Sequence, residues 1–204
     1  MSGEIDHNSR RFHAAISRFD AENAADPNRE CVEGAQQPKE LVYARRLTEW
    51  VLHLCPDASE SLRLAARCQH ICRWSIPRND YPEGRIGYLK WRAELKKFHA
   101  EKAGQILREC GYSEELVEAV QALNLKKNFP RDADSRVLED ALCLVFLEFQ
   151  FAALAAKSTE EKMVDVLRKS WIKMTESARR AALQLSFGPV EQRLIQQALA
   201  GGGQ

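Results

Sequence analysis

The sequence has little glycine and proline, almost no net charge and no long uninterrupted apolar run. Ten glycines and seven prolines in 204 residues are few for an all-β chain, which needs many turns. The 30 Lys+Arg nearly balance the 29 Asp+Glu, so bulk charge does not favour coating of nucleic acid or of an anionic membrane. The longest apolar run, residues 141–156, contains Glu148 and Gln150 and is too short for a membrane span.

Signals for export and for structural zinc are also missing. The N-terminus has no apolar stretch of the kind that a secretory signal requires. The six cysteines include no C-x-x-C pair. Cys68 and Cys72 are four residues apart on a predicted helix, and this spacing favours core packing over a metal site. These features predict a cytoplasmic protein.

Helical spacing of apolar residues recurs along most of the chain, and no segment alternates as a strand does. The pattern predicts an all-α fold, a single compact multi-helix domain with a frayed tail at 201–204. Residues 1–39 are predicted to be a helix followed by an irregular connection, and 40–200 to be the helical core. The Asp57/Glu60 and Ser158/Glu161 pairs are predicted capping boxes. The nine predicted helices lie at about 7–20, 40–54, 58–74, 89–109, 113–124, 136–156, 158–174, 176–184 and 189–199.

Residues 63–97 depart from the average composition. They contain nine Lys or Arg and three Asp or Glu, a local balance of +6 in a chain of net +1. Four aromatic residues are interleaved with these charges, and residues 75–88 contain two prolines and two glycines that interrupt any helix. Arginine binds phosphate in a bidentate manner and aromatic rings stack on bases or sugars. The segment therefore predicts a focused anion pocket, and the alternative is a solvated basic face. Its candidate substrate-binding residues are Arg73, Arg78, Tyr81, Arg85, Arg92 and Lys96.

Two histidines are candidates for this pocket. His99 follows Arg92 and Lys96 on one helix face, and nearby cations disfavour protonation of an imidazole. A neutral imidazole can bind a metal or act as a base. The alternative is a partly exposed histidine beside ordinary surface cations. His70 lies near the end of the predicted 58–74 helix, where either a site role or a core position fits.

Asp140 is a candidate because it falls on an apolar helical stripe with Val137, Cys143 and Leu144. A buried carboxylate requires a partner, and a metal ion, His70 or an arginine of the basic segment would each serve. The alternative is an acid near the start of its own helix. Glu148 raises the same question with less specificity.

Long segments of the chain resemble the uncharacterised family called domain of unknown function 4202. They include ELVYARRLTEW, AARCQHICRWSIPR, YPEGRIGYLKWRAELKKFHAEKAG, LEDALCLVFLE and EEKMVDVLRKSWIKM. The similarity covers nearly the whole chain. It implies no particular activity.

The order of segments also resembles the HD-domain metal-dependent phosphohydrolases, which are all-α. That resemblance implies that His70, His99 and Asp140 hold a divalent ion (Mn, Fe, Zn or Mg) and that His99 and Asp140 are catalytic. The chain departs from the pattern in two places. Tyr43 occupies the early histidine position, and Gln69-His70 replaces the His-Asp pair.

Two main hypotheses follow, and a third is a structural or regulatory helical protein whose basic face meets an acidic partner. The first is a metal-dependent hydrolase of a phosphorylated or nucleotide-like small molecule. The second is a non-catalytic nucleotide- or RNA-binding module on a degenerate HD-like scaffold. Both imply a small anionic or phosphorylated ligand, with extended nucleic acid a weaker candidate because the positive charge is local. The sequence leaves the oligomeric state open, as well as the choice between enzyme and binding module.

Overall fold

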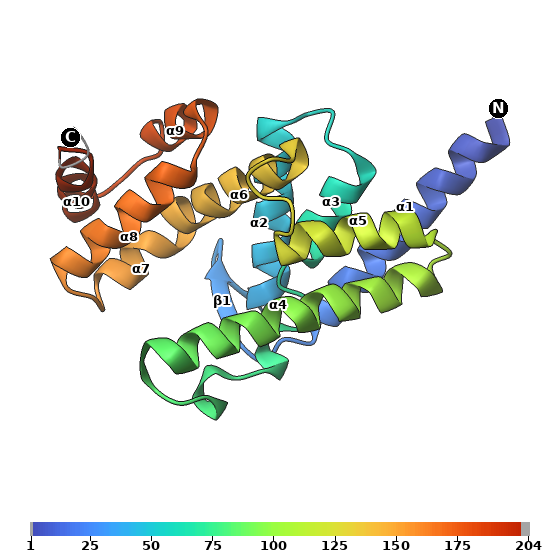
Figure 1. Cartoon of the computed structure of the whole chain (residues 1–204), viewed down its shortest axis with the longest axis horizontal. Helices are drawn as coiled ribbons and strands as arrows, with labels where there is room; N and C mark the ends of the chain where they lie inside the picture. The colour runs from blue at the N-terminus through green and yellow to red at the C-terminus, as the bar shows by residue number, and fades with distance from the viewer. Residues whose placement is uncertain (1, 201–204) are drawn as a thin grey trace.

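Helices form almost all of the regular structure. The computed structural model describes residues 2–200, with side chains from residue 9 onwards, so the predicted frayed tail lies outside the described residues. Within them the all-α prediction is confirmed. The α-helices are α1 Ser2–Ala24, α2 Lys39–Leu54, α3 Glu60–Cys68, α4 Gly84–Glu109, α5 Glu114–Leu125, α6 Ala133–Val145, α7 Phe151–Ala155, α8 Glu160–Lys173, α9 Glu176–Leu183 and α10 Pro189–Ala200. The first and last helices lie at opposite ends of the molecule (Figure 1).

Side-chain caps set the start of several helices. The side chains of Ser59, Asp132, Thr159 and Thr175 each accept a hydrogen bond from a backbone N–H three residues on. Such caps satisfy amide groups that have no partner within the helix. The capping boxes predicted at Asp57 and Ser158 are wrong, because Ser59 and Thr159 are the residues that cap α3 and α8.

A short β-hairpin replaces part of the irregular connection predicted before residue 40. Strands β1 (Arg29–Val32) and β2 (Ala35–Pro38) pair antiparallel, with Val32 opposite Ala35. The two residues between them, Glu33 and Gly34, both have positive φ, as a type I′ turn requires. Strands of four residues are too short to show a clear alternation of polar and apolar residues, so the sequence pattern misses them.

Two hydrophobic clusters form the core, and α6 contributes residues to both. The first cluster contains residues of α1–α6, among them the fully buried Phe19, Leu47 and Leu107. The second joins the end of α6 to α7–α10 around Phe151 and Met163. Trp50 and Leu54 of α2 pack against both clusters. Burial of apolar surface at about 25 cal/mol per Å² is the main stabilising term in such a fold.

Two predicted helices are interrupted. The predicted 58–74 helix ends at Cys68 and is followed by turns and two short 3₁₀ segments, η1 (Arg73–Ser75) and η2 (Arg78–Asp80). The predicted 136–156 helix is divided by a π-helical turn, η3 (Phe146–Gln150), which lies between α6 and α7. Single π-helical turns often occur at functional sites. Both interruptions lie beside the cavities described below.

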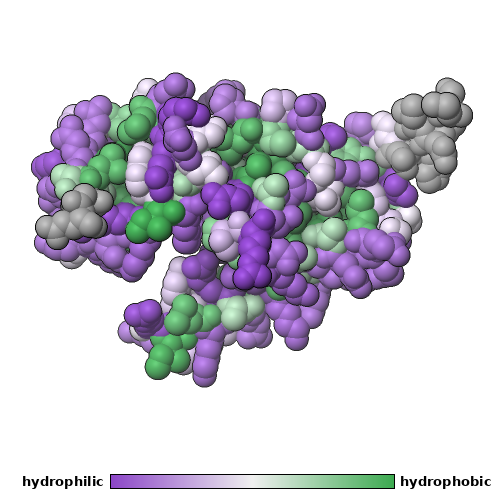
Figure 2. All heavy atoms as spheres, turned by 45° about the horizontal axis from the view of Figure 1, so that its top comes forward, coloured by the Kyte–Doolittle hydropathy of each residue, from purple (hydrophilic) through white to green (hydrophobic). Residues whose placement is uncertain are grey.

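The N-terminal part of α4 and the loop before it project from the body of the molecule (Figure 1). This arm carries the exposed apolar side chains Ile86, Tyr88 and Leu89. The space-filling view shows an apolar patch on the projecting part, and a recess between this part and the C-terminal helices (Figure 2). Across the described residues, helix length and apolar content fall short of what crossing a bilayer demands.

Candidate functional site

The turn after α3 places His70 outside a helix. The backbone N–H of Cys72, a residue with φ of 51°, donates to Oδ1 of the buried Asn23 at 3.1 Å. This contact ties the turn to α1 and holds a left-handed conformation that is uncommon for cysteine. The imidazole of His70 then stacks on the Tyr43 ring, with the ring centroids 4.2 Å apart. Tyr43 therefore packs against one face of the His70 ring.

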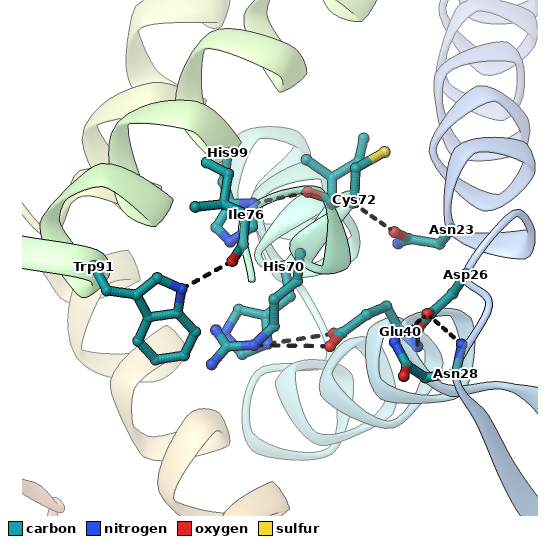
Figure 3. A network of polar contacts seen from close by, with 11 residues as sticks. Asn23, Asp26, Asn28, Glu40, His70, Cys72, Ile76, Trp91 and His99 are labelled. Atoms are coloured by element: carbon teal, nitrogen blue, oxygen red, sulfur yellow. Dashed lines mark hydrogen bonds and ion pairs between the residues drawn. The ribbon is translucent and has the colours of Figure 1, made fainter. Parts of the chain in front are cut away.

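The buried Glu40 lies beside His70 (Figure 3). Its Oε2 is 3.6 Å from Nδ1 of His70, and its Oε1 is 3.8 Å from Nε of Arg73. Burial raises the pKa of Glu40 to about 7 although Arg73 opposes the shift. Burial lowers the pKa of His70 well below its ordinary value, and Arg73, Lys126 and Arg92 lower it further. A neutral imidazole therefore lies next to a carboxyl group that is partly protonated near neutral pH.

His99 of α4 lies close to His70, with the ring centroids 5.8 Å apart. It is only 3% exposed, so the alternative of a partly exposed histidine is wrong. Its Nδ1 is 2.8 Å from the carbonyl oxygen of Ile71 (Figure 3). Burial, followed by the neighbouring His70, lowers the pKa of His99 to about 3, so the ring is neutral at physiological pH. The predicted neutral state therefore holds, mainly because the ring is buried.

A cavity of about 420 Å³ opens beside the two histidines. Its walls come from the turn after α3 with η1, from α4, from the end of α5, and from α6, η3, α7 and α8. Glu139 is the one acidic side chain among the described residues that line it. The cationic side chains that line it are Arg73, Arg92, Lys96, Lys126 and Lys173. Burial and the like charges of Lys126 and Arg92 lower the pKa of Lys96, which indicates that positive charge is crowded here.

Glu139 neutralises only part of this charge. It is 5% exposed and forms ion pairs with Lys126 and, at 3.2 Å, with Lys173. Burial alone would raise the pKa of Glu139, but the two lysines lower it, and the net shift is downwards. The pairs bring a residue after α5 and a residue at the end of α8 to the same carboxylate. Of the other three cations in the lining, Arg73 lies near the buried Glu40. Arg92 and Lys96 form no ion pair with a carboxylate of the described residues.

A second cavity, of about 620 Å³, adjoins the first. The two share His70, Arg73, Phe146, Gln150 and Leu154 in their linings. Three of these residues belong to η3 and α7, so the π-helical turn shapes the boundary between the cavities. The second cavity adds Tyr43 and Phe149, and the guanidinium of Arg46 lies 3.9 Å from the centre of the Phe149 ring. Together the cavities have the size of a small-molecule site.

The predicted substrate-binding residues separate into two groups. Arg73, Arg92 and Lys96 line the first cavity. Arg78 instead donates to the carbonyl oxygens of Tyr81 and Pro82 at 2.9 and 3.0 Å, and so braces the loop before α4. Arg85 is exposed in the first turn of α4. None of Arg78, Tyr81 and Arg85 is among the described residues that line these two cavities.

Asp140 points to a different part of the structure. Its two carboxylate oxygens accept hydrogen bonds from the backbone N–H of Thr175 at 2.9 Å and from the Thr175 hydroxyl at 2.5 Å. Thr175 caps α9, so Asp140 joins α6 to the start of α9. The structure thus brings His70 and His99 together and directs Asp140 to another partner. Among the described residues, no three His, Cys, Asp or Glu side chains form a group that could hold a metal ion. His70, His99 and Asp140 therefore do not form the predicted metal site, because the Asp140 carboxylate is bound by Thr175.

Several residues that line the first cavity were not predicted from the sequence. Lys126 and Lys173 follow or end other helices, and no local pattern connects them with residues 63–97. Glu139 had a usable signal, because Leu142, Cys143 and Phe146 follow it at helical spacing and line the same cavity. The apolar stripe drew attention to the neighbouring Asp140, which is rotated by about 100° around the helix.

Comparison with known proteins identifies a family. The family model described as Domain of unknown function (DUF4202) matches residues 13–195. The chain belongs to this family. For this DUF4202 member, neither a curated protein nor a solved structure gives a match. The match spans α2–α9 completely, and therefore includes every residue that lines the first cavity.

Proposed function

We propose that this DUF4202 protein binds a phosphorylated small molecule in the cavity beside His70 and His99. The observation that supports this most is the lining itself, in which five cationic side chains face one carboxylate. Lysine and arginine bind phosphate through charge-assisted hydrogen bonds, which are stronger than neutral ones. Burial, followed by the like charges of Lys126 and Arg92, lowers the pKa of Lys96, and a bound anion relieves the repulsion among these charges.

The position of these cations favours a small ligand over an extended nucleic acid. Lys96, Lys126 and Lys173 come from three different helices or their ends and surround one recess. An extended phosphate backbone needs cations spaced along a groove, and its binding falls steeply with salt. A compact ligand with one or two phosphates is expected to show a shallower dependence on salt.

Metal-dependent hydrolysis on an HD-like scaffold was the other function expected from sequence. The family match and the helical fold are compatible with it, but the geometry does not favour it, because the Asp140 carboxylate is engaged by Thr175. The neutral His99 and the partly protonated Glu40 leave acid–base chemistry on a bound ligand open to test. Binding of a phosphorylated ligand is therefore the function that we propose.

Lys96→Ala tests this proposal. Loss of one charge-assisted contact is expected to weaken binding of inorganic phosphate or pyrophosphate by roughly 10- to 100-fold, because such a contact contributes about 1.5–3 kcal/mol. Isothermal titration calorimetry on the wild type and the variant measures this directly.

Lys97→Ala is the matched control. Lys97 is the next residue of α4, is exposed and pairs with Glu101 at 3.7 Å, outside the cavity. Its removal is expected to change phosphate affinity by less than about twofold, since exposed ion pairs contribute little. Equal effects of the two variants, or no phosphate binding by the wild type, would contradict the proposal.

A further inference from the structure

Two buried hydrogen-bond acceptors of the first cavity have no partner within the described part of the protein. They are Nε2 of His99 and Oε1 of Gln69. The two residues are 3% and 6% exposed, and both line the cavity that contains the cations. A buried polar atom without a partner costs about 1–3 kcal/mol, so such atoms in a native protein need an explanation.

The hydrogen-bonding role of each atom is determined by its surroundings. A carbonyl oxygen only accepts, so the 2.8 Å contact with Ile71 requires that Nδ1 of His99 carries the proton. The ring is neutral, because its pKa is lowered to about 3, and Nε2 therefore presents a lone pair. Oε1 of Gln69 is an acceptor by its chemistry. Both atoms are therefore acceptors, and neither has a donor among the described residues.

The phosphoryl group of a ligand cannot supply these donors. A phosphate monoester dianion offers only acceptor oxygens, which match Arg92, Lys96, Lys126 and Lys173. The cavity of about 420 Å³ also has more room than one phosphoryl group needs, because it falls within the range for drug-sized ligands. The rest of the ligand should therefore carry donors that reach Nε2 of His99 and Oε1 of Gln69.

We propose that the ligand is a hydroxylated phosphomonoester of the sugar-phosphate class. Its phosphoryl group contacts the cations, and its hydroxyl groups donate to His99 and Gln69, which act as specificity-determining residues. This inference rests on the proposed function. The sugar phosphate can be a free molecule or part of a nucleotide, whose base would extend towards Tyr43 and Phe149 in the adjoining cavity.

Three probes separate these contributions. Methyl phosphate carries a phosphoryl group without hydroxyls, ribose 5-phosphate adds hydroxyls, and adenosine 5′-monophosphate adds a base. Wild-type protein is expected to bind ribose 5-phosphate about tenfold more tightly than methyl phosphate, because two neutral hydrogen bonds contribute about 0.5–1.5 kcal/mol each. Calorimetric titration gives the ratio of the two dissociation constants.

Substitutions then show which residues cause the difference between the dissociation constants of methyl phosphate and ribose 5-phosphate. His99→Phe removes one of the two acceptors and is expected to lower the ratio by roughly threefold, with methyl phosphate affinity changed by less than about twofold. Gln69→Met is a second variant that leaves the Ile71 contact intact and is expected to lower the ratio by roughly threefold, since one of the two bonds remains. His13→Phe, at an exposed histidine of α1, is the control and should leave the ratio unchanged.

The outcomes distinguish this inference from the proposed function. If wild-type protein binds methyl phosphate and ribose 5-phosphate equally, or if His99→Phe weakens both equally, the hydroxyl recognition is wrong and phosphate binding stands. If neither compound binds, both are wrong. Tighter binding of adenosine 5′-monophosphate, with the same dependence on His99, supports the inference and identifies a nucleotide as the source of the sugar phosphate.

Discussion

Asp140→Ala is expected to lower the free energy of unfolding by about 2–4 kcal/mol and to leave phosphate affinity unchanged. The substitution removes the acceptor for both the backbone N–H and the hydroxyl of Thr175. Each donor left without a partner in a buried place costs about 1–3 kcal/mol, and part of the α9 cap is lost as well. Chemical denaturation of the variant and the wild type measures the difference.

Asp165→Ala is the matched control for this prediction. Asp165 is 58% exposed and pairs with Lys169 of the same helix at 2.5 Å. Exposed pairs at this spacing contribute about 0.3–0.5 kcal/mol, so the control should be nearly as stable as the wild type. If Asp140→Ala folds with unchanged stability but loses phosphate binding or a bound divalent metal, the structural role is wrong. The function assigned to Asp140 from sequence would then be supported.

Glu40→Gln is expected to remove a pH dependence of stability that the wild type shows. Burial raises the pKa of Glu40 from 4.5 to about 7 in the folded protein. Between these values the folded state binds a proton that the unfolded state does not, so stability falls as pH rises. The stabilising contribution is complete below pH 4.5 and is lost as pH passes through about 7. At 1.36 kcal/mol per pKa unit the total change is about 3 kcal/mol.

Unfolding free energies at about pH 5 and about pH 8 test this point. The difference between Glu40→Gln and the wild type should shift by about 2.5 kcal/mol in favour of the variant at the higher pH. Arg73, Asp26, Lys39 and His99 also act on the Glu40 carboxyl, and all four are present in both the variant and the wild type. Glu49→Gln, on the exposed side of the same helix, is the matched control. Parallel pH profiles of Glu40→Gln and the wild type would contradict the prediction.

Much of the fold was predictable because helix formation is local. Apolar residues at helical spacing indicated α2, α5 and α8 with ends near those observed. The positive charge of residues 63–97 directed attention to Arg73, Arg92 and Lys96, which line the first cavity. The two histidines chosen from sequence lie in the same site. These successes depend on composition and periodicity within short windows, which an amino-acid sequence expresses directly.

The choice between adjacent acids was decided by tertiary packing. Glu139 and Asp140 are both buried in α6, and both have apolar neighbours at helical spacing. Only the packing of α5, α8 and α9 shows that Glu139 meets Lys126 and Lys173 while Asp140 meets Thr175. Partners that lie 13 to 35 residues away leave no local pattern in the sequence.

The sequence by itself determined an all-α chain with a local excess of positive charge and two histidines near it. The tertiary structure decided that helices from separate segments enclose this charge in a cavity, and that burial makes His99 a neutral acceptor. It also decided the interruption of the predicted helices after Cys68 and at η3. The physical reason is that helix periodicity depends on neighbouring residues, whereas desolvation and charge pairing depend on residues that only folding brings together.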